Sequence, residues 1–159
     1  MADDRTVGDL YQRALALLAK REHSRWELRR KLLSRFPNQP DYVNEVLVRL
    51  EREAYQSDAR FVEAFVRMRQ TKGIGAQRLR QELRMRGVED HLIECALMPS
   101  VDENEILQQL LPVWQKKFAK LPSDAKEKHR QMRFLLYRGF RQRDIESLFA
   151  HLKNDSSDL

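Results

Sequence analysis

Residues 70–88, QTKGIGAQRLRQELRMRGV, are the stretch that decides the fold. The helix before them should end at Gly73-Ile-Gly75, because a glycine just past a helix supplies the left-handed backbone that other residues resist. A second, short helix should follow with Leu79 and Leu83 on one face and end at Gly87. The stretch therefore predicts a helix, a glycine turn and a short second helix.

The charge asymmetry of the chain lies in the same region. From Arg67 to Arg86 there are seven basic residues and one acid, Glu82, which gives +6. The whole 159-residue chain is also +6, with 30 Lys plus Arg against 24 Asp plus Glu, so the remainder balances to zero. Such an excess suits a polyanion or an acidic protein surface as partner, and a solvated helix face is the alternative.

The composition is typical of a helix-rich protein. Charged residues make up 34%, there are five glycines and five prolines, and no alternating β-branched runs occur. The longest apolar run, residues 14–19, is too short for a membrane span or a signal-peptide core. The single cysteine, Cys95, sits among apolar helical positions, so we expect it to be buried in a reducing compartment. We expect a cytoplasmic protein with no membrane partner.

Three similar units follow one another along the chain. Leu28 and Leu79 are 51 residues apart, as are Leu32 and Leu83. Each unit combines a long helix, a short basic helix and a third helix, so we predict an all-α fold of three tandem three-helix repeats forming an elongated, curved molecule. The predicted divisions are unit one, 1–56, unit two, 57–99, unit three, 100–153, and a polar tail, 154–159, that should fray.

Local signals place the helix ends. Ser24-Arg-Trp-Glu27 and Ser100-Val-Asp-Glu103 are capping boxes, Pro40 suits a first helical position, and Pro112 should disturb its helix. The fourth helix should turn Phe61, Ala64, Phe65 and Met68 inward. The expected helices are residues 7–21, 24–36, 40–54, 58–72, 76–86, 89–97, 100–120, 124–137 and 144–152.

The third unit follows the repeat less closely than the other two. Arg138-Gly-Phe140 matches Arg86-Gly-Val88 at an offset of 52. At the position that corresponds to Leu79, however, Gln131 stands in place of leucine. The sequence therefore leaves the register of the third unit open.

No catalytic, cofactor or metal site is predicted. The histidines, His23, His91, His129 and His151, are scattered and belong to no metal-binding spacing. Gly73-Ile-Gly75 follows a helix and lacks the rest of a nucleotide-binding loop. Nothing in the sequence pairs a serine or cysteine nucleophile with a base, so we expect a protein that is not an enzyme.

Basic residues on the middle helices are the candidate binding site. On a helical wheel Arg80 and Arg84 lie opposite Leu79 and Leu83. Arginine suits phosphates and carboxylates alike, so the chemistry of the partner stays open. If the units stack, these helices form one positive stripe. The candidates are Arg25, Arg29, Arg30, Lys31, Arg78, Arg80, Arg84, Lys126, Arg130, Arg133 and Arg138.

Two aromatic residues, Trp26 and Tyr137, lie next to basic positions and are the candidates for exposure, although core packing is the commoner role of such residues.

Several short segments are specific in their order and spacing, although each alone is a weak helical motif. They are Ala14-Leu-Ala-Leu-Leu, Arg21-Glu-His-Ser24, Glu27-Leu-Arg-Arg-Lys-Leu32, Asp58-Ala-Arg-Phe61, Gly73-Ile-Gly75, Arg78-Leu-Arg-Gln-Glu-Leu83 and Arg133-Phe-Leu-Leu-Tyr-Arg-Gly-Phe140. Together they resemble the RecX family, bacterial regulatory proteins that restrain the RecA recombinase. The resemblance covers nearly the whole chain.

The resemblance implies a monomeric three-helix-repeat protein that lies in the helical groove of the RecA nucleoprotein filament. Such a protein limits filament growth, strand exchange, ATP hydrolysis and the co-protease activity used in the SOS response. The resemblance brings no catalytic residues and no cofactor, and it allows a weak contact with single- or double-stranded DNA. The alternative is a basic, helix-turn-helix-like nucleic-acid-binding module.

Overall fold

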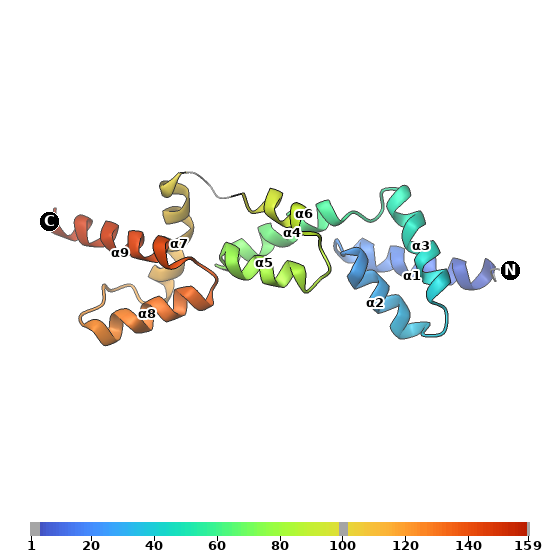
Figure 1. Ribbon diagram of the computed structural model, residues 1–159, viewed down its shortest axis with the longest axis horizontal. Coiled ribbons are helices and arrows are strands. Elements are labelled where there is room, and N and C mark those ends of the chain that lie inside the picture. The colour runs from blue at the N-terminus through green and yellow to red at the C-terminus, as the bar shows by residue number, and fades with distance from the viewer. Residues whose placement is uncertain (1–3, 99–101, 159) are drawn as a thin grey trace. The chain divides into compact units, whose positions relative to one another are not determined.

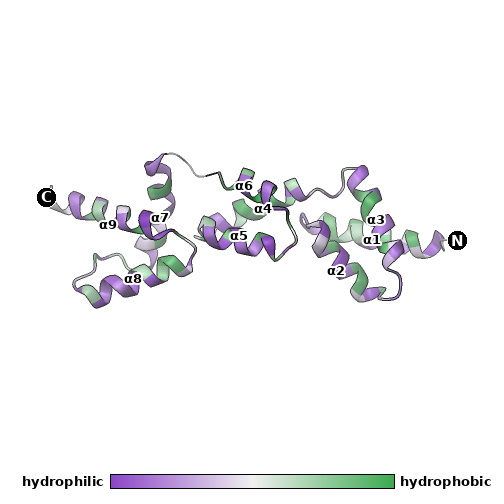
Figure 2. Ribbon diagram, in the orientation of Figure 1, coloured by the Kyte–Doolittle hydropathy of each residue, from purple (hydrophilic) through white to green (hydrophobic). Residues whose placement is uncertain are grey.

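Every regular element is a helix in the computed structural model, which describes residues 4–98 and 102–158 (Figure 1). The absence of strands from these residues confirms the predicted all-α class. Figure 2 shows both polar and apolar residues on the helices, as expected for helices that bury one face. The described helices are α1 (Asp4–Lys20), α2 (Arg25–Arg35), α3 (Pro40–Arg52), α4 (Asp58–Thr71), α5 (Ala76–Arg84), α6 (Asp90–Ala96), α7 (Glu103–Lys117), α8 (Ala125–Tyr137) and α9 (Gln142–Ser157).

The chain divides into two compact units. Unit 1 contains the residues through Phe65 together with Leu83–Ala96, and unit 2 contains Val66–Glu82 together with the residues from Leu97 onward. Helices α1, α2 and α3 therefore lie in unit 1 and α7, α8 and α9 in unit 2, while α4 and α5 contribute residues to both.

The helix ends follow local signals. Pro40 occupies the start of α3, as predicted. Gly73 follows α4 with a φ of +78°, Gly87 follows α5 with a φ of +72°, and Gly139 follows α8 with a φ of +99°. These left-handed conformations are the ones that glycine adopts without strain, so the predicted role of Gly73 is confirmed.

The predicted capping box at the start of α2 is also confirmed. The Ser24 hydroxyl accepts a hydrogen bond from the Glu27 amide at 3.1 Å, and the Ser24 amide donates to the Glu27 carboxylate at 3.2 Å. Both bonds satisfy amides that a helix start otherwise leaves without partners.

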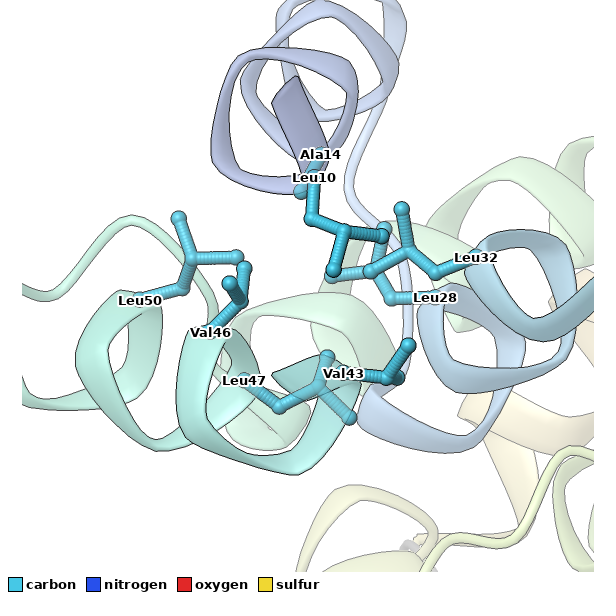
Figure 3. Close-up of a cluster of buried hydrophobic side chains, with 8 residues drawn as sticks. All are labelled: Leu10, Ala14, Leu28, Leu32, Val43, Val46, Leu47 and Leu50. Carbon is cyan, nitrogen blue, oxygen red and sulfur yellow. The ribbon is translucent and has the colours of Figure 1, made fainter. Parts of the chain in front are cut away.

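Helices α1, α2 and α3 share the core of unit 1. Leu28 and Leu32 are buried there, as the repeat predicted. Figure 3 shows the side chains of the three helices converging on one another. The buried members of this core are Leu10, Ala14, Leu28, Leu32, Val43, Val46, Leu47 and Leu50.

The buried face of α4 differs from the prediction. Phe61, Val62, Phe65 and Val66 are buried, whereas Ala64 is exposed and Met68 is 45% exposed. At about 100° per residue, Ala64 and Met68 lie roughly 130° and 90° from the centre of the buried face. The two valines therefore take the core positions that we expected Ala64 and Met68 to fill.

Cys95 is exposed, and the expectation that it is buried was wrong. Helix α6 has seven residues and buries Ile93. Two residues further along, Cys95 is rotated by about 200° from Ile93 and so faces away from the core.

The start of α7 also differs from the prediction. Its N-cap is Asp102, whose carboxylate accepts from the Asn104 amide at 3.0 Å. Ser100, the N-cap of the predicted capping box, lies outside the described residues. Pro112 lies within α7 without ending the helix.

The C-terminal residues are helical further than expected. Helix α9 continues to Ser157, so the expectation of a frayed tail from residue 154 was wrong. The hydroxyls of Ser156 and Ser157 donate to the carbonyls of Leu152 and Lys153, one turn earlier, at 2.9 and 3.0 Å.

Unit 2 has its own core, which settles the register of the third repeat. Gln131 is buried and accepts a hydrogen bond from the indole Nε1 of Trp114 at 2.7 Å, while its amide donates to the Lys120 carbonyl at 3.0 Å. Gln131 thus fills the core position of Leu79 with a satisfied polar pair. The buried apolar members of this core are Leu110, Trp114, Leu135, Phe140, Ile145, Leu148 and Phe149.

A close approach of two turns joins the repeats within unit 2. The Gly75 amide donates to the Arg138 carbonyl at 2.8 Å, and the Gln77 amide donates to the Gly139 carbonyl at 3.0 Å. A Cβ on Gly75 would lie 2.6 Å from the Gly139 carbonyl, and a Cβ on Gly139 would lie 2.5 Å from the Arg78 Cβ. Only glycine allows backbone to meet backbone at both positions.

The same joint occurs within unit 1 at the corresponding positions of the repeat. The Ser24 hydroxyl donates to the Arg86 carbonyl at 2.8 Å. A Cβ on Gly87 would lie 2.6 Å from the Trp26 Cβ. Arg86 and Gly87 correspond to Arg138 and Gly139, so both joints place the turn after a middle helix against the start of the preceding middle helix.

We predict that Gly75→Ala lowers the free energy of unfolding by about 1 to 3 kcal/mol, because the new methyl group overlaps the Gly139 backbone. Gly8→Ala is the matched control. Gly8 lies inside α1 with no atom near its Cβ position, so alanine there should raise stability by roughly 0.5 to 1 kcal/mol. Urea unfolding followed by circular dichroism measures both, and equal effects would contradict this account of the joint.

We also predict that Gln131→Leu destabilises unit 2 by about 1 to 3 kcal/mol, although leucine is the residue at the matching position of α5. The change leaves the buried Trp114 indole N–H without its acceptor. Urea unfolding of this variant beside Gln131→Leu combined with Trp114→Phe checks the cause. The double variant should be more stable than the single one, and a further loss of stability would argue against it.

Candidate partner-binding surface

The predicted basic residues of α2 are exposed in unit 1. Arg25, Arg29, Arg30 and Lys31, which we call the α2 basic patch, are all exposed. The Arg30 guanidinium lies over the ring of Trp26, 4.7 Å from its centroid, and Trp26 is 39% exposed. Trp26 therefore takes the exposed position that was open to it rather than the commoner core role, and it places an aromatic surface beside the cations.

Internal contacts of the α2 basic patch leave most of its charge available. The Arg25 guanidinium lies 3.6 Å from the Glu51 carboxylate, and both side chains are exposed. Arg29 donates to the side-chain oxygen of Asn44 at 3.3 Å. A solvent-exposed ion pair of this length contributes little stability, so a partner can compete for it at small cost.

The three predicted residues of α5 are more strongly engaged. In unit 1, Arg84 Nε lies 2.9 Å from the Asp90 carboxylate, in an exposed pair. In unit 2, Arg80 donates to the Gln77 side chain at 3.2 Å. Arg78 is half-buried there, and its guanidinium lies 5.0 Å from the ring centroid of Tyr137.

Arg78 also belongs to an ion cluster around Glu82. Arg69 donates to the Glu82 carboxylate at 2.9 Å from Nε and 2.5 Å from a terminal nitrogen, and Arg78 donates to it at 3.2 Å. Burial alone would raise the pKa of Glu82, but the hydrogen bonds and charges of Arg69 and Arg78 hold the pKa below its ordinary value. Arg78 therefore has a structural role in linking α5 to the end of α4.

The predicted residues of α8 form a second exposed patch, in unit 2. Lys126, Arg130 and Arg133, the α8 basic patch, recur at i, i+4 and i+7 and so share one helix face. Arg130 lies 3.7 Å from the Glu127 carboxylate. Lys126 and Arg133 form no ion pair with any residue that the structure describes. Tyr137, one turn beyond Arg133, is 76% exposed and so does not take the commoner core role.

Arg138 is placed differently from the α8 basic patch. Its side chain is half-buried, donates to the Lys72 carbonyl at 3.0 Å and lies 5.1 Å from the ring centroid of Phe134. The candidates thus fall into two groups. Those on α2 and α8 are exposed, whereas those on α5, and Arg138 after α8, contact other side chains or backbone of the protein. The single stripe through all three repeats stays a prediction.

Three lysines that the candidates omit, Lys72, Lys116 and Lys117, line a cavity of about 540 Å³ in unit 2. A signal for two of them was present, since residues 106–123 contain three lysines and no acidic residue. Their proximity to Lys72 could not be inferred, because that depends on how α7 packs against the turn after α4.

A buried histidine lies beside the α2 basic patch. His23 Nδ1 is 3.0 Å from the Arg21 carbonyl, which can only accept, so the neutral ring donates there and Nε2 accepts from the Lys31 ammonium at 3.1 Å. Burial lowers the pKa of His23, and the charges of Arg21 and Lys31 lower it further. The hydrogen bond to the Arg21 carbonyl and the charge of Glu27 oppose this.

Two kinds of feature are absent from the described residues. No group of three or more His, Cys, Asp or Glu side chains in this part of the chain could hold a metal ion. Among the same residues, no helix has the length and apolar character needed to cross a bilayer.

Three family models match the chain in succession. They are described as the first, second and third three-helix domains of RecX, and they match residues 11–50, 57–97 and 103–149. The chain belongs to the RecX family. The predicted succession of three three-helix repeats is thereby confirmed.

Relatives of similar length carry the name "Regulatory protein RecX". The one from Pseudomonas syringae pv. tomato is 46% identical over 129 residues, which cover 80% of this chain and 81% of the relative. The one from Pseudomonas fluorescens is 42% identical, covering 86% and 87%. The one from Serratia proteamaculans is 36% identical, covering 90% and 97%.

Solved RecX structures share the fold. The crystal structure of RecX from Lactobacillus salivarius superimposes with a TM-score of 0.80 at 21% identity, covering 94% of this chain and 98% of that one. A second RecX crystal structure gives a TM-score of 0.71 at 19% identity, covering 90% and 71%. The RecX fold is therefore retained at low sequence identity.

We predict that this RecX protein loses stability as the pH falls below about 6.5, the pKa of an unfolded histidine. Because burial lowers the folded pKa of His23, the unfolded state binds the proton first. The stability that the neutral His23 contributes is fully present above that pH. It is lost as the pH falls toward the folded pKa, and the free energy of unfolding drops by no more than about 1.4 kcal/mol per pH unit.

Urea unfolding between about pH 8 and about pH 5.5 measures this dependence. A His23→Gln variant should show a flatter profile, whereas His129→Gln, at an exposed histidine, should match the wild type. An unchanged profile in His23→Gln would show that His23 does not cause the dependence.

Proposed function

We propose that this RecX protein binds the RecA nucleoprotein filament and restrains the recombinase, ATPase and co-protease activities of RecA. It would thereby regulate DNA repair and the SOS response. The observation that carries the proposal is the match to RecX domains in all three repeats, among relatives whose name states regulation and no reaction. We take residues 1–56, 57–99 and 100–153 as its repeat units and a cytoplasmic monomer as its working form.

The α2 and α8 basic patches are the surfaces that we assign to this contact. A filament of protein on DNA presents phosphates and carboxylates together, and arginine binds both through paired N–H donors. Lys126 and Arg133 have no acidic partner among the described residues, and the pairs of Arg25 and Arg130 are long and exposed. These side chains can therefore turn to a partner without breaking a strong internal bond.

Direct nucleic-acid binding is the second candidate, and the exposed aromatic residues favour it. Trp26 and Tyr137 each lie beside arginines, and aromatic rings with arginine can bind bases and backbone together. Binding to RecA on single-stranded DNA, compared with binding to the same DNA alone, separates the two. Equal binding in both cases would favour the nucleic-acid module.

We predict that Lys126→Glu combined with Arg133→Glu weakens inhibition of RecA by about tenfold or more, because attraction to an anionic surface becomes repulsion. The loss should be larger at low salt, where charges are screened less. The measurement is the concentration of this protein that halves RecA-catalysed ATP hydrolysis on single-stranded DNA.

The charge-matched control is Arg143→Glu with Lys153→Glu, at exposed positions of α9 outside both patches. It should inhibit like the wild type. Circular dichroism checks that both variants are folded. Full inhibition by the folded α8 variant would remove the α8 basic patch from the contact surface.

A further inference from the structure

A groove in unit 2 is not explained by the two basic patches. It lies where the turn after α4 meets α7 and the end of α8, and its volume is about 540 Å³. All residues that line it belong to unit 2. Lys72, Lys116, Lys117 and Arg138 line its walls.

The groove presents apolar side chains between its polar walls. Ile74 and Phe140 are buried at 4% and 7% exposure, and Val113 and Phe134 are half-buried. These four residues come from the α4–α5 turn, α7, α8 and the α8–α9 turn. Binding an apolar side chain of a ligand against such a surface is favourable, because both apolar surfaces leave water.

The polar walls carry positive charge only. Lys72, Lys116, Lys117 and Arg138 line the groove, together with glutamines and a threonine, and no carboxylate does. None of the three lysines forms an ion pair with a described residue. Four cations around one groove repel one another, and an anionic ligand would relieve that repulsion.

The corresponding place in unit 1 is neutralised internally. The turn at residues 21–24 matches the turn at 72–75 at an offset of 51. There Arg60 lies 3.2 Å from the Glu22 carboxylate, and Arg86, the counterpart of Arg138, lies over the ring of Phe65 at 4.6 Å. The turn in unit 1 therefore carries an acid, Glu22, that pairs with a nearby arginine, whereas no acid lines the groove in unit 2.

The aromatic ring of the groove offers little room to a nucleobase. Lys117 Nζ lies 5.5 Å and the Arg138 guanidinium 5.1 Å from the centroid of Phe134, and Phe118 packs edge-on against the same ring at 5.3 Å. Stacking of a base requires a free ring face. The apolar surface with cationic walls suits instead a peptide in which carboxylates flank an aliphatic side chain.

The geometry points to this groove as a docking site for an acidic segment of a partner protein. An aliphatic side chain of the segment lies on Val113, over the buried Ile74, and its carboxylates pair with Lys72 on one wall and Lys116 and Lys117 on the other. The contact adds a peptide-recognition site to the protein that does not depend on the α2 and α8 basic patches.

The test uses the full chain and a fluorescein-labelled peptide in which a Leu-Leu pair is flanked on both sides by Asp and Glu. Fluorescence anisotropy should show binding by the wild type. Lys116→Glu with Lys117→Glu should weaken it by about tenfold or more, and Lys72→Glu from the opposite wall should weaken it in the same direction. The charge-matched control on α9, Arg143→Glu with Lys153→Glu, should bind like the wild type.

Two further probes separate the contributions of charge and apolar contact. A peptide with Ser-Ser in place of Leu-Leu should bind more weakly, and so should one with Asn and Gln in place of the acids. Circular dichroism confirms that each variant is folded. Absence of binding, equal binding by the wall variants, or displacement of the peptide by oligo(dT) would overturn the proposal, and none of these results would bear on the inhibition of RecA.

Discussion

The approach of backbone to backbone at glycine is the constraint on which the joints between repeats depend. At Gly75 and Gly139 two turns come so close that amides of one donate directly to carbonyls of the other. Ser24 makes the corresponding bond in unit 1 with its hydroxyl, which also accepts from the amide of Glu27. The same position of the repeat thus donates from a backbone amide in unit 2 and from a hydroxyl in unit 1. Both bonds satisfy a carbonyl at a helix end.

These joints also place the charged side chains. The bond that holds the Arg138 carbonyl to Gly75 brings the Arg138 guanidinium to the Lys72 carbonyl and onto the edge of the groove in unit 2. Glu82 of α5 forms ion pairs with Arg69 and Arg78 inside the protein. Positive charge therefore remains available on α2, on α8 and around the groove, and the surface charge of this RecX protein follows from its internal pairing.

The surfaces that we propose for binding are of two kinds. The basic patches of α2 and α8 consist of exposed, long side chains, which suit an extended anionic surface. The groove in unit 2 is concave and partly apolar, which suits a short peptide segment. A regulator that holds a large partner gains affinity when separate surfaces bind at once, because the second contact is made at high effective concentration.

Local sequence signals determined the helices, the capping box at Ser24, the left-handed Gly73 and the all-α class, because each depends on residues within one or two turns of each other. The repeat in the sequence also determined that Leu28, Leu32, Leu79 and Leu83 are buried. Only the tertiary structure decided that Met68 and Cys95 are exposed and that Gln131 belongs in a core. It also decided that Arg78 is engaged within unit 2 while Lys72, Lys116 and Lys117 meet around one groove. Periodicity identifies the faces of a helix, but which face is covered, and by what, depends on neighbours that are distant in the chain.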